Sequence, residues 1–174
     1  MIWNTEGYHG TDPVAAEQIL SQKKFLPTRE EDAWLGEGVY FFIDDSDACW
    51  WCEKNKRIKK YAVLKAEITP NTVIDLVASK EDSDHFKLAC DMVKGKCSKV
   101  SSGRPRKNYM SLAINHMLKA APKPDAIIGG FQENREMYYN YEEVLKFPFK
   151  PLQIQICVIN HECISGVCLH KGVE

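Results

Sequence analysis

Two short motifs near the amino end combine a chemically useful side chain with glycines, which allow a ligand to approach the backbone. The first is GYHGT, residues 7–11, and the second is WLGEGVYFF, residues 34–42, in which Tyr40 follows two glycines. A histidine can hydrogen-bond a ligand through one ring nitrogen while the other is anchored, and a tyrosine face attracts a pyridinium cation by about 0.5 to 2 kcal/mol. Together the motifs predict one pocket for a planar, positively charged ring.

Each motif also has a purely structural interpretation. His9 could satisfy a turn, and Tyr40 could be one of the many strand aromatics that fill a core. Trp34 could guard the mouth of a pocket, or only cover the core beneath its own loop. The order of the features favours the functional interpretation, because a histidine, a helix that begins at Pro13 and a Gly-x-Gly-Val-Tyr run follow one another along the chain.

The seven cysteines are scattered through the predicted strands and helices. An odd number without the spacing of a disulfide framework is typical of a reducing compartment, and we expect a cytoplasmic protein. Cys49 and Cys52 form a C-x-x-C, but the second close pair that a zinc ribbon needs is missing downstream. A thioredoxin-like pair is no better supported, because CWWC falls inside a predicted helix. We therefore expect no bound metal.

Length and charge limit the classes of protein to consider. The 174 residues are 44% hydrophobic, and we expect residues 1–174 to form one domain. The net charge of −1 gives no overall bias toward nucleic acid or an anionic membrane. No stretch reaches the roughly 20 apolar residues of a membrane span, and the first residues lack the basic and apolar runs of a secretory signal. The sequence thus predicts no membrane partner.

Periodicity and capping signals predict the elements that position these motifs. A helix begins at Pro13, capped by Thr11 or Asp12, and ends near Lys23. Further helices are expected over 47–57, 79–94 and 109–120, and the basic segment 94–107 and the segment 132–151 are expected to be connections. Strands are expected over 2–9, 39–42, 61–68, 72–76, within 122–131, and over 152–159 and 163–170.

About four helices among six or more short strands, without strict alternation, predict an α+β fold rather than a doubly wound sheet. The alternation over 61–68 predicts a strand with one face on a core. The GEGVY run lacks the third glycine and the downstream acid of a dinucleotide-binding Rossmann turn, and nothing matches a phosphate-binding P-loop. If a nucleotide binds this protein, it binds by other means.

In the order of these features the chain resembles the ADP-ribosyltransferase superfamily, in the H-Y-E branch that includes diphtheria toxin and the poly-ADP-ribose polymerases. The likeness rests on His9-Gly10-Thr11, on the run from Gly36 to Phe41, and on QICVIN, which begins at Gln155 where the family places a glutamate. It covers about the first 50 residues well, the last 25 loosely and the middle by order alone. The resemblance implies an ADP-ribosyltransferase-like split β-sandwich with flanking helices.

Members of that family bind NAD, expel nicotinamide and transfer ADP-ribose to an acceptor through an oxocarbenium-like transition state. By resemblance, His9 would hydrogen-bond the adenosine ribose, Gly10 would offer backbone groups to the carboxamide, and Tyr40 would stack on the nicotinamide ring. The implied catalytic triad is His9, Tyr40 and Gln155. The implied NAD-binding set is His9, Gly10, Thr11, Gly38 and Tyr40.

The amide at the third position limits the activity that the resemblance implies. A glutamine grips a ribose hydroxyl but does not stabilise positive charge, and losing a charge-assisted contact costs about 1 to 3 kcal/mol. We therefore expect mono-ADP-ribosylation rather than polymer formation. Gln153 alternates with Gln155, so both should lie on one face, and Gln153 is expected at the acceptor. Glu133 is a second acceptor-site candidate, although it could simply be a solvated surface residue.

The acceptor is expected to be a protein or a nucleic acid. The six basic residues of segment 94–107 could recruit RNA, DNA or an acidic protein, although exposed lysine runs are usually only solvated. Toxin-like members of the family commonly have a neutralising protein partner, which the resemblance extends to this chain. Two alternatives stay open: a non-catalytic module that binds NAD, ADP-ribose or a protein through the same cleft, and an NAD glycohydrolase.

Overall fold

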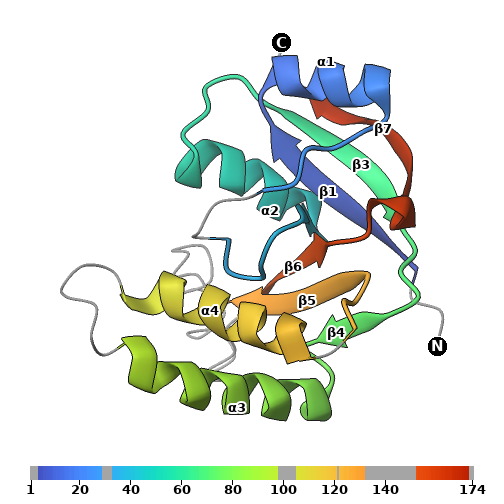
Figure 1. Cartoon of the computed structure of the whole chain (residues 1–174). Helices are drawn as coiled ribbons and strands as arrows, with labels where there is room; N and C mark the ends of the chain where they lie inside the picture. The colour runs from blue at the N-terminus through green and yellow to red at the C-terminus, as the bar shows by residue number, and fades with distance from the viewer. Residues whose placement is uncertain (1–3, 29–32, 98–104, 121, 132–151, 173–174) are drawn as a thin grey trace, which may run out of the picture.

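A computed structural model describes residues 4–28, 33–97, 105–120, 122–131 and 152–172 (Figure 1). The strands are β1 (Thr5–Thr11), β2 (Val39–Phe42), β3 (Ala62–Ile68), β4 (Val73–Asp75), β5 (Ala126–Phe131), β6 (Gln153–Val158) and β7 (Ile164–Gly172). The helices are α1 (Pro13–Gln22), α2 (Asp45–Trp50), α3 (Lys80–Cys97) and α4 (Pro105–Ala120), with a π-helical turn η1 (Trp51–Asn55) and a 3-10 turn η3 (His161–Cys163). The predicted connection over 132–151, with Glu133, lies outside the described residues.

The seven strands form one mixed sheet in the order β4-β5-β6-β2-β1-β3-β7. The β4–β5 pair is parallel, and the other neighbouring strands run antiparallel. A mixed sheet with helices packed on it confirms the predicted α+β class.

The sheet is weakly joined at its centre. β1 pairs with β3 over seven residues and β2 with β6 over four, but β1 and β2 share one registered pair, Tyr8 opposite Phe42. Figure 1 shows the consequence, since β1, β3 and β7 run together in one half of the molecule and β6, β5 and β4 in the other. The two candidate motifs of the sequence lie at this junction.

Helix α1 begins and ends where the sequence predicts. Asp12 is the N-cap, and its Oδ1 accepts hydrogen bonds from the backbone N–H groups of Val14 and Ala15, each at 3.0 Å. Thr11 is the last residue of β1 and does not cap the helix. The chain leaves α1 at Lys23, which has a left-handed φ of 53°. Local capping chemistry therefore suffices to place this helix.

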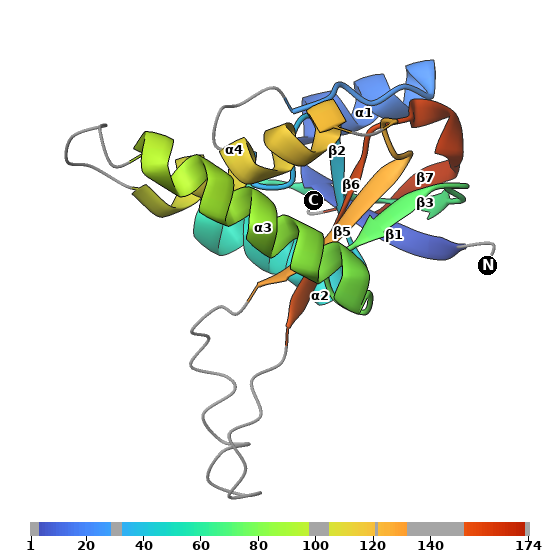
Figure 2. The ribbon, with the colours of Figure 1, turned by 60° about the horizontal axis from the view of Figure 1, so that its bottom comes forward.

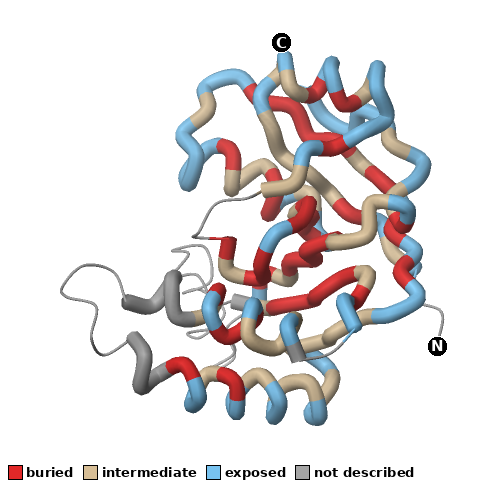
Figure 3. Tube along the Cα trace, viewed as in Figure 1, coloured by how far each residue is buried: buried red, intermediate tan, exposed pale blue. Residues whose placement is uncertain are grey.

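Helices cover both faces of the sheet. Ala16 and Ile19 of α1 pack on one face with Phe41, while α2 and the α3–α4 pair pack on the other. Figure 2 shows α3 and α4 side by side, and Figure 1 shows them at the opposite end of the molecule from α1. Figure 3 shows buried residues along the central strands, between these layers. Among the described residues, no helix is long and apolar enough to cross a bilayer.

Tertiary packing adds details that the sequence does not predict. The predicted core face of β3 is confirmed, because Ala62, Leu64, Ala66 and Ile68 are buried. On the other face Val63 is also buried, beneath α2, whereas Glu67 is exposed. On α4, Leu112 is 46% exposed, because Ala113 packs against α3 while Ile114 packs against the sheet. The basic segment 94–107 is helical at both ends, since α3 extends to Cys97 and α4 begins at Pro105.

Candidate functional site

His9 lies on β1 beside the junction of the two halves of the sheet. Its Nδ1 atom lies 2.8 Å from the carbonyl oxygen of Tyr40 on β2. Because a carbonyl oxygen only accepts, Nδ1 carries a proton and donates. Burial lowers the pKa of His9, although the bond to Tyr40 opposes that shift. The neutral ring therefore leaves Nε2 as an acceptor, and no described residue hydrogen-bonds it.

The imidazole of His9 packs among aromatic rings. Its centroid lies 5.2 Å from that of Phe25 in an edge-on arrangement and 5.7 Å from that of Phe41. Phe25 and Phe41 are themselves edge-on to each other and almost fully buried. This aromatic cluster fixes the orientation of the imidazole and explains its lowered pKa.

The Tyr40 phenol is held by the turn that precedes its own strand. Its hydroxyl donates to the Gly36 carbonyl at 2.7 Å and accepts from the Leu35 backbone N–H at 3.0 Å. Gly36 has φ of 89°, a left-handed conformation that favours glycine, which explains the first glycine of the motif. Burial raises the pKa of Tyr40. The hydroxyl is thus committed to the turn, and only the ring remains to contact a ligand.

The structure brings His9 and Tyr40 together through the backbone rather than through their two rings. With Tyr8 opposite Phe42, His9 lies on the same face as Phe41, and Tyr40 lies on the other face. The phenol accordingly packs with Leu35, Ile114 and Cys157, beneath α4. The pocket that we expected between the imidazole and the phenol is therefore not formed by these side chains directly; the Tyr40 carbonyl links them.

Gly10 and Gly38 both allow close backbone packing. A Cβ atom on Gly10 would lie 2.5 Å from Cys52 Sγ and 2.8 Å from the Ala48 carbonyl oxygen, so the helix formed by α2 and η1 presses against β1 here. A Cβ on Gly38 would lie 2.6 Å from both Cys157 Sγ and the Val158 carbonyl oxygen. Both glycines are required by packing, whatever ligand binds.

Gln155 lies at the centre of the sheet, on the same face as Tyr40. It is 3% exposed and pairs with Phe42 on β2 and Gly129 on β5. Its Oε1 accepts a hydrogen bond from Trp34 Nε1 at 2.8 Å. The Trp34 ring reaches across the sheet, since a Cβ on Gly129 would lie 2.5 Å from it. The sequence suggested two structural roles for Trp34 but not that it contacts Gln155.

Gln153 shares this face, as its alternation with Gln155 predicts. It is 3% exposed, and its Nε2 donates to Asp47 Oδ1 at 3.0 Å. Its Oε1 is buried and has no hydrogen-bond partner among the described residues. An unsatisfied buried acceptor costs about 1 to 3 kcal/mol, so this oxygen is suited to a donor from outside the described structure. Sequence analysis missed Asp47, because it lies 106 residues away along the chain.

The C-x-x-C lies within the helix formed by α2 and η1. Cys52 is buried and Cys49 is half-buried, and both are free thiols. Burial raises the pKa of Cys52 to about 11. Within the described ranges, no three His, Cys, Asp or Glu side chains gather in a way that could hold a metal ion.

Comparison with known proteins gives one informative similarity. The uncharacterized protein MJ0359 of Methanocaldococcus jannaschii is 30% identical over an alignment of 180 positions, which covers 91% of this chain and 83% of the archaeal protein. No protein-family model matches the chain, and no solved structure matches it.

Proposed function

We propose that this chain, which belongs to the same protein family as MJ0359 of Methanocaldococcus jannaschii, is an NAD-dependent mono-ADP-ribosyltransferase. It transfers ADP-ribose from NAD to a protein or nucleic-acid acceptor and releases nicotinamide. The proposal combines the motif resemblance to the H-Y-E branch with the geometry of the junction between β1 and β2.

The observation that carries the proposal is the hydrogen bond between His9 and the Tyr40 carbonyl. It joins two motifs that are 31 residues apart in sequence, at the point where β1 and β2 separate. Separation of the two central strands is the feature expected of a split β-sandwich. An imidazole anchored at Nδ1 presents a fixed Nε2, which is the atom available for a ligand.

The proposed NAD contacts come from the motif resemblance. Because the His9 imidazole and the Tyr40 ring lie on opposite faces of the sheet, NAD would have to reach both across the junction where β1 and β2 separate. The lone pair of His9 Nε2 accepts a hydrogen bond from a ribose hydroxyl, and the backbone of Gly10 receives the nicotinamide carboxamide. Tyr40 contributes its ring face, because its hydroxyl is occupied by Leu35 and Gly36. Thr11 ends β1 and Gly38 directly precedes β2, so both flank these contacts and need no direct role in the chemistry.

Because Gln155 stands where the family has a glutamate, we expect the proposed transferase to be slow. Oxocarbenium character at the anomeric carbon is stabilised by a neighbouring carboxylate, whereas the Gln155 amide offers only hydrogen bonds. Its Oε1 already accepts from Trp34, which leaves Nε2 to bind a ribose hydroxyl. The buried carboxylate of Asp47 accepts a hydrogen bond from Gln153, which lies on the same face as Gln155.

A non-catalytic NAD- or ADP-ribose-binding module is the second candidate. Gln155 favours this candidate, because a buried amide that is hydrogen-bonded to Trp34 can bind a ligand but carries no charge to stabilise a cationic transition state. An NAD glycohydrolase is the third, in which water takes the place of the acceptor.

NAD labelled separately in its nicotinamide and adenylate parts distinguishes these functions. The transferase releases nicotinamide and leaves adenylate label on a macromolecule in a cell extract, whereas the glycohydrolase releases nicotinamide without labelling one. Binding without release supports the module. Tyr40→Leu should abolish transfer while Tyr40→Phe retains it, since only phenylalanine keeps the ring face. Equal loss in both variants would contradict the role given to the ring.

A further inference from the structure

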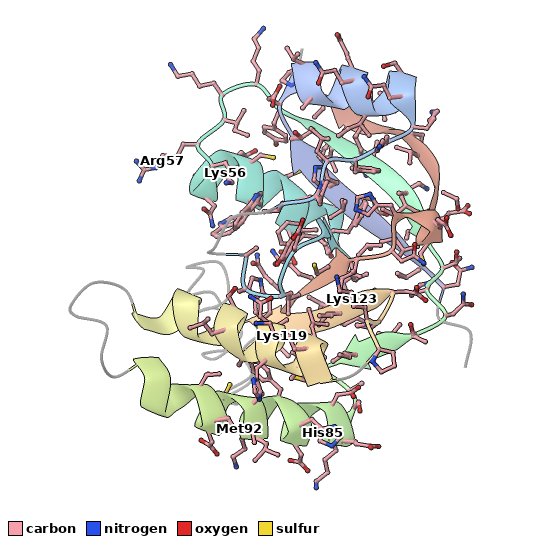
Figure 4. The ribbon with its side chains drawn as sticks, viewed as in Figure 1. Lys56, Arg57, His85, Met92, Lys119 and Lys123 are labelled. Carbon is pink, nitrogen blue, oxygen red and sulfur yellow. The ribbon has the colours of Figure 1, made fainter. Side chains whose placement is uncertain are left out.

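A short segment after η1 carries a dense positive charge. Within residues 54–60, KNKRIKK, five of seven side chains are basic, although the whole chain has a net charge of −1. All five are exposed: Lys54, Lys56, Arg57, Lys59 and Lys60. Figure 4 shows Lys56 and Arg57 extending outward beside the end of the helix formed by α2 and η1.

Among the described residues, no carboxylate forms an ion pair with this basic segment. The adjacent carboxylate, Glu53, accepts a hydrogen bond from the Tyr61 hydroxyl at 2.6 Å. The ion pairs among described side chains are those of Glu6 with Lys65, Lys80 with Asp84 and Asp45 with His170, so none involves the basic segment. Five neighbouring cations therefore face solvent and repel one another.

The end of a helix explains only part of this arrangement. Cations are favoured near the carboxyl end of a helix, but the effect fades within the last turn. Lys54 lies in the last turn of η1, and Lys56 follows directly. Arg57, Lys59 and Lys60 lie beyond that turn, where the helix dipole gives no reason for their charge.

The segment has a defined shape. The Lys56 backbone N–H donates to the Trp51 carbonyl and that of Ile58 donates to the Cys52 carbonyl, both at 2.9 Å. Ile58 packs into the cluster that contains Val63. Arg57 has a left-handed φ of 54°. A backbone held in this way fixes the points from which the basic side chains extend, which lowers the backbone entropy lost when a partner binds.

An aromatic ring adjoins the charges. Lys56 Nζ lies 5.8 Å from the centroid of the Trp51 ring, which is half-buried and 6.1 Å from the Phe42 ring. Cations beside an aromatic face are typical of proteins that bind single-stranded nucleic acid, because phosphates pair with the cations and bases stack on the ring. A duplex keeps its bases stacked internally, and an acidic peptide has no bases to stack.

We propose that segment 54–60, with Trp51, binds single-stranded nucleic acid. The same helix connects this surface to the junction of the sheet, since Ala48 and Cys52 pack directly against Gly10. As a binding surface it is independent of NAD chemistry. Its further role, to hold a nucleic-acid acceptor near the NAD site, rests on the proposed function.

Fluorescence anisotropy with labelled RNA and DNA strands of about 12 nucleotides tests the binding without NAD. Wild-type protein should bind the single strands more tightly than the matching duplex or a polyglutamate peptide. Neutralising five phosphates predicts a log–log salt slope of about −3.5, so raising salt from about 50 to 200 mM should weaken binding roughly a hundredfold. The Lys59→Gln/Lys60→Gln double variant should reduce that slope by about 1.4.

Matched variants separate specific from general effects. Lys24→Gln/Lys87→Gln removes two exposed charges elsewhere and should leave binding unchanged, whereas Trp51→Leu should weaken it about tenfold by removing the stacking face. Circular dichroism and thermal unfolding verify that each variant is folded. The Tyr40→Leu variant is expected to lack transferase activity but should still bind the strands. Nucleic-acid binding is therefore tested separately from the proposed transferase function.

The proposal would be overturned by any of three results. The first is that wild-type protein shows no salt-dependent binding. The second is that the Lys24→Gln/Lys87→Gln control loses as much binding as the Lys59→Gln/Lys60→Gln variant. The third is that wild-type protein prefers the duplex or polyglutamate to the single strands.

Discussion

The Nδ1 atom of His9 lies 2.8 Å from the Tyr40 carbonyl oxygen, so a side chain of β1 bonds the backbone of β2 where the two strands separate. This contact fixes the tautomer, because the carbonyl can only accept. Nδ1 bonds the two strands at the junction of the sheet. In the proposed function, Nε2 is the atom that accepts a hydrogen bond from NAD.

Burial of His9 predicts a pH-dependent stability. Its pKa in the folded protein is lowered from 6.5, so the unfolded chain binds more protons in the interval just below pH 6.5. The contribution of neutral His9 to the free energy of unfolding should therefore be complete above that pH. It should decrease as the pH falls toward the pKa of His9 in the folded protein. Urea unfolding between about pH 5 and pH 8 measures this slope.

His9→Asn should remove this part of the slope, because asparagine does not titrate in that range. His85→Gln, at an exposed position on α3, is the matched control and should leave the slope of wild-type protein intact. If the His9 variant and wild-type protein lose stability equally with falling pH, the buried neutral imidazole is not the cause.

Tyr40→Phe should separate stability from activity. The change leaves the Leu35 N–H without its partner and the Gly36 carbonyl with only the Cys157 thiol at 3.6 Å, which should lower the free energy of unfolding by about 1 to 3 kcal/mol. Nicotinamide release should persist, because the ring face remains. Chemical denaturation and a release assay on the same preparation measure both effects. A stable but inactive Phe variant would assign the hydroxyl a chemical role that its two hydrogen bonds argue against.

Gln155→Glu should keep or raise nicotinamide release. A glutamate can still accept the hydrogen bond of Trp34 Nε1, and its charge would stabilise a cationic transition state by about 1 to 3 kcal/mol, or roughly ten- to a hundredfold in rate. Trp34→Phe, which removes that donor, is the companion variant and should lower release whether it is made in wild-type protein or combined with Gln155→Glu. A well-folded Gln155→Glu protein without any release would argue strongly against Gln155 at the reaction centre.

Gly10→Ala should destabilise the protein by about 1 to 3 kcal/mol, because the added Cβ would overlap Cys52 Sγ and the Ala48 carbonyl oxygen. Thermal unfolding measures the loss. Gly172→Ala is the control, since its Cβ would meet only Leu169, at 3.9 Å. Similar unfolding temperatures for the two variants would mean that α2 does not press against β1 as closely as described.

Local signals in the sequence predicted the elements well. The Asp12 cap and Pro13 placed α1, and alternation placed β3 and the shared face of Gln153 and Gln155. These features depend on neighbours within a few residues, so they can be read without the fold.

The arrangement of the site depends on strand register, which the sequence does not encode locally. His9 and Tyr40 face opposite sides of the sheet because Tyr8 lies opposite Phe42. The bond from Trp34 to Gln155 joins residues 121 apart, and the Tyr40 hydroxyl is held by a turn whose geometry depends on Gly36. Single motifs thus predicted the residues of the candidate site but not how their side chains are arranged.

The most direct test of the account is the rate of nicotinamide release from NAD by wild-type protein compared with His9→Asn. Asparagine can still donate to the Tyr40 carbonyl, so the junction should hold while the Nε2 acceptor is lost. The account predicts saturable release by wild-type protein and at least a roughly tenfold lower rate in the variant. Wild-type protein that releases no nicotinamide with or without cell extract, or a variant that matches it, would contradict NAD chemistry at this junction.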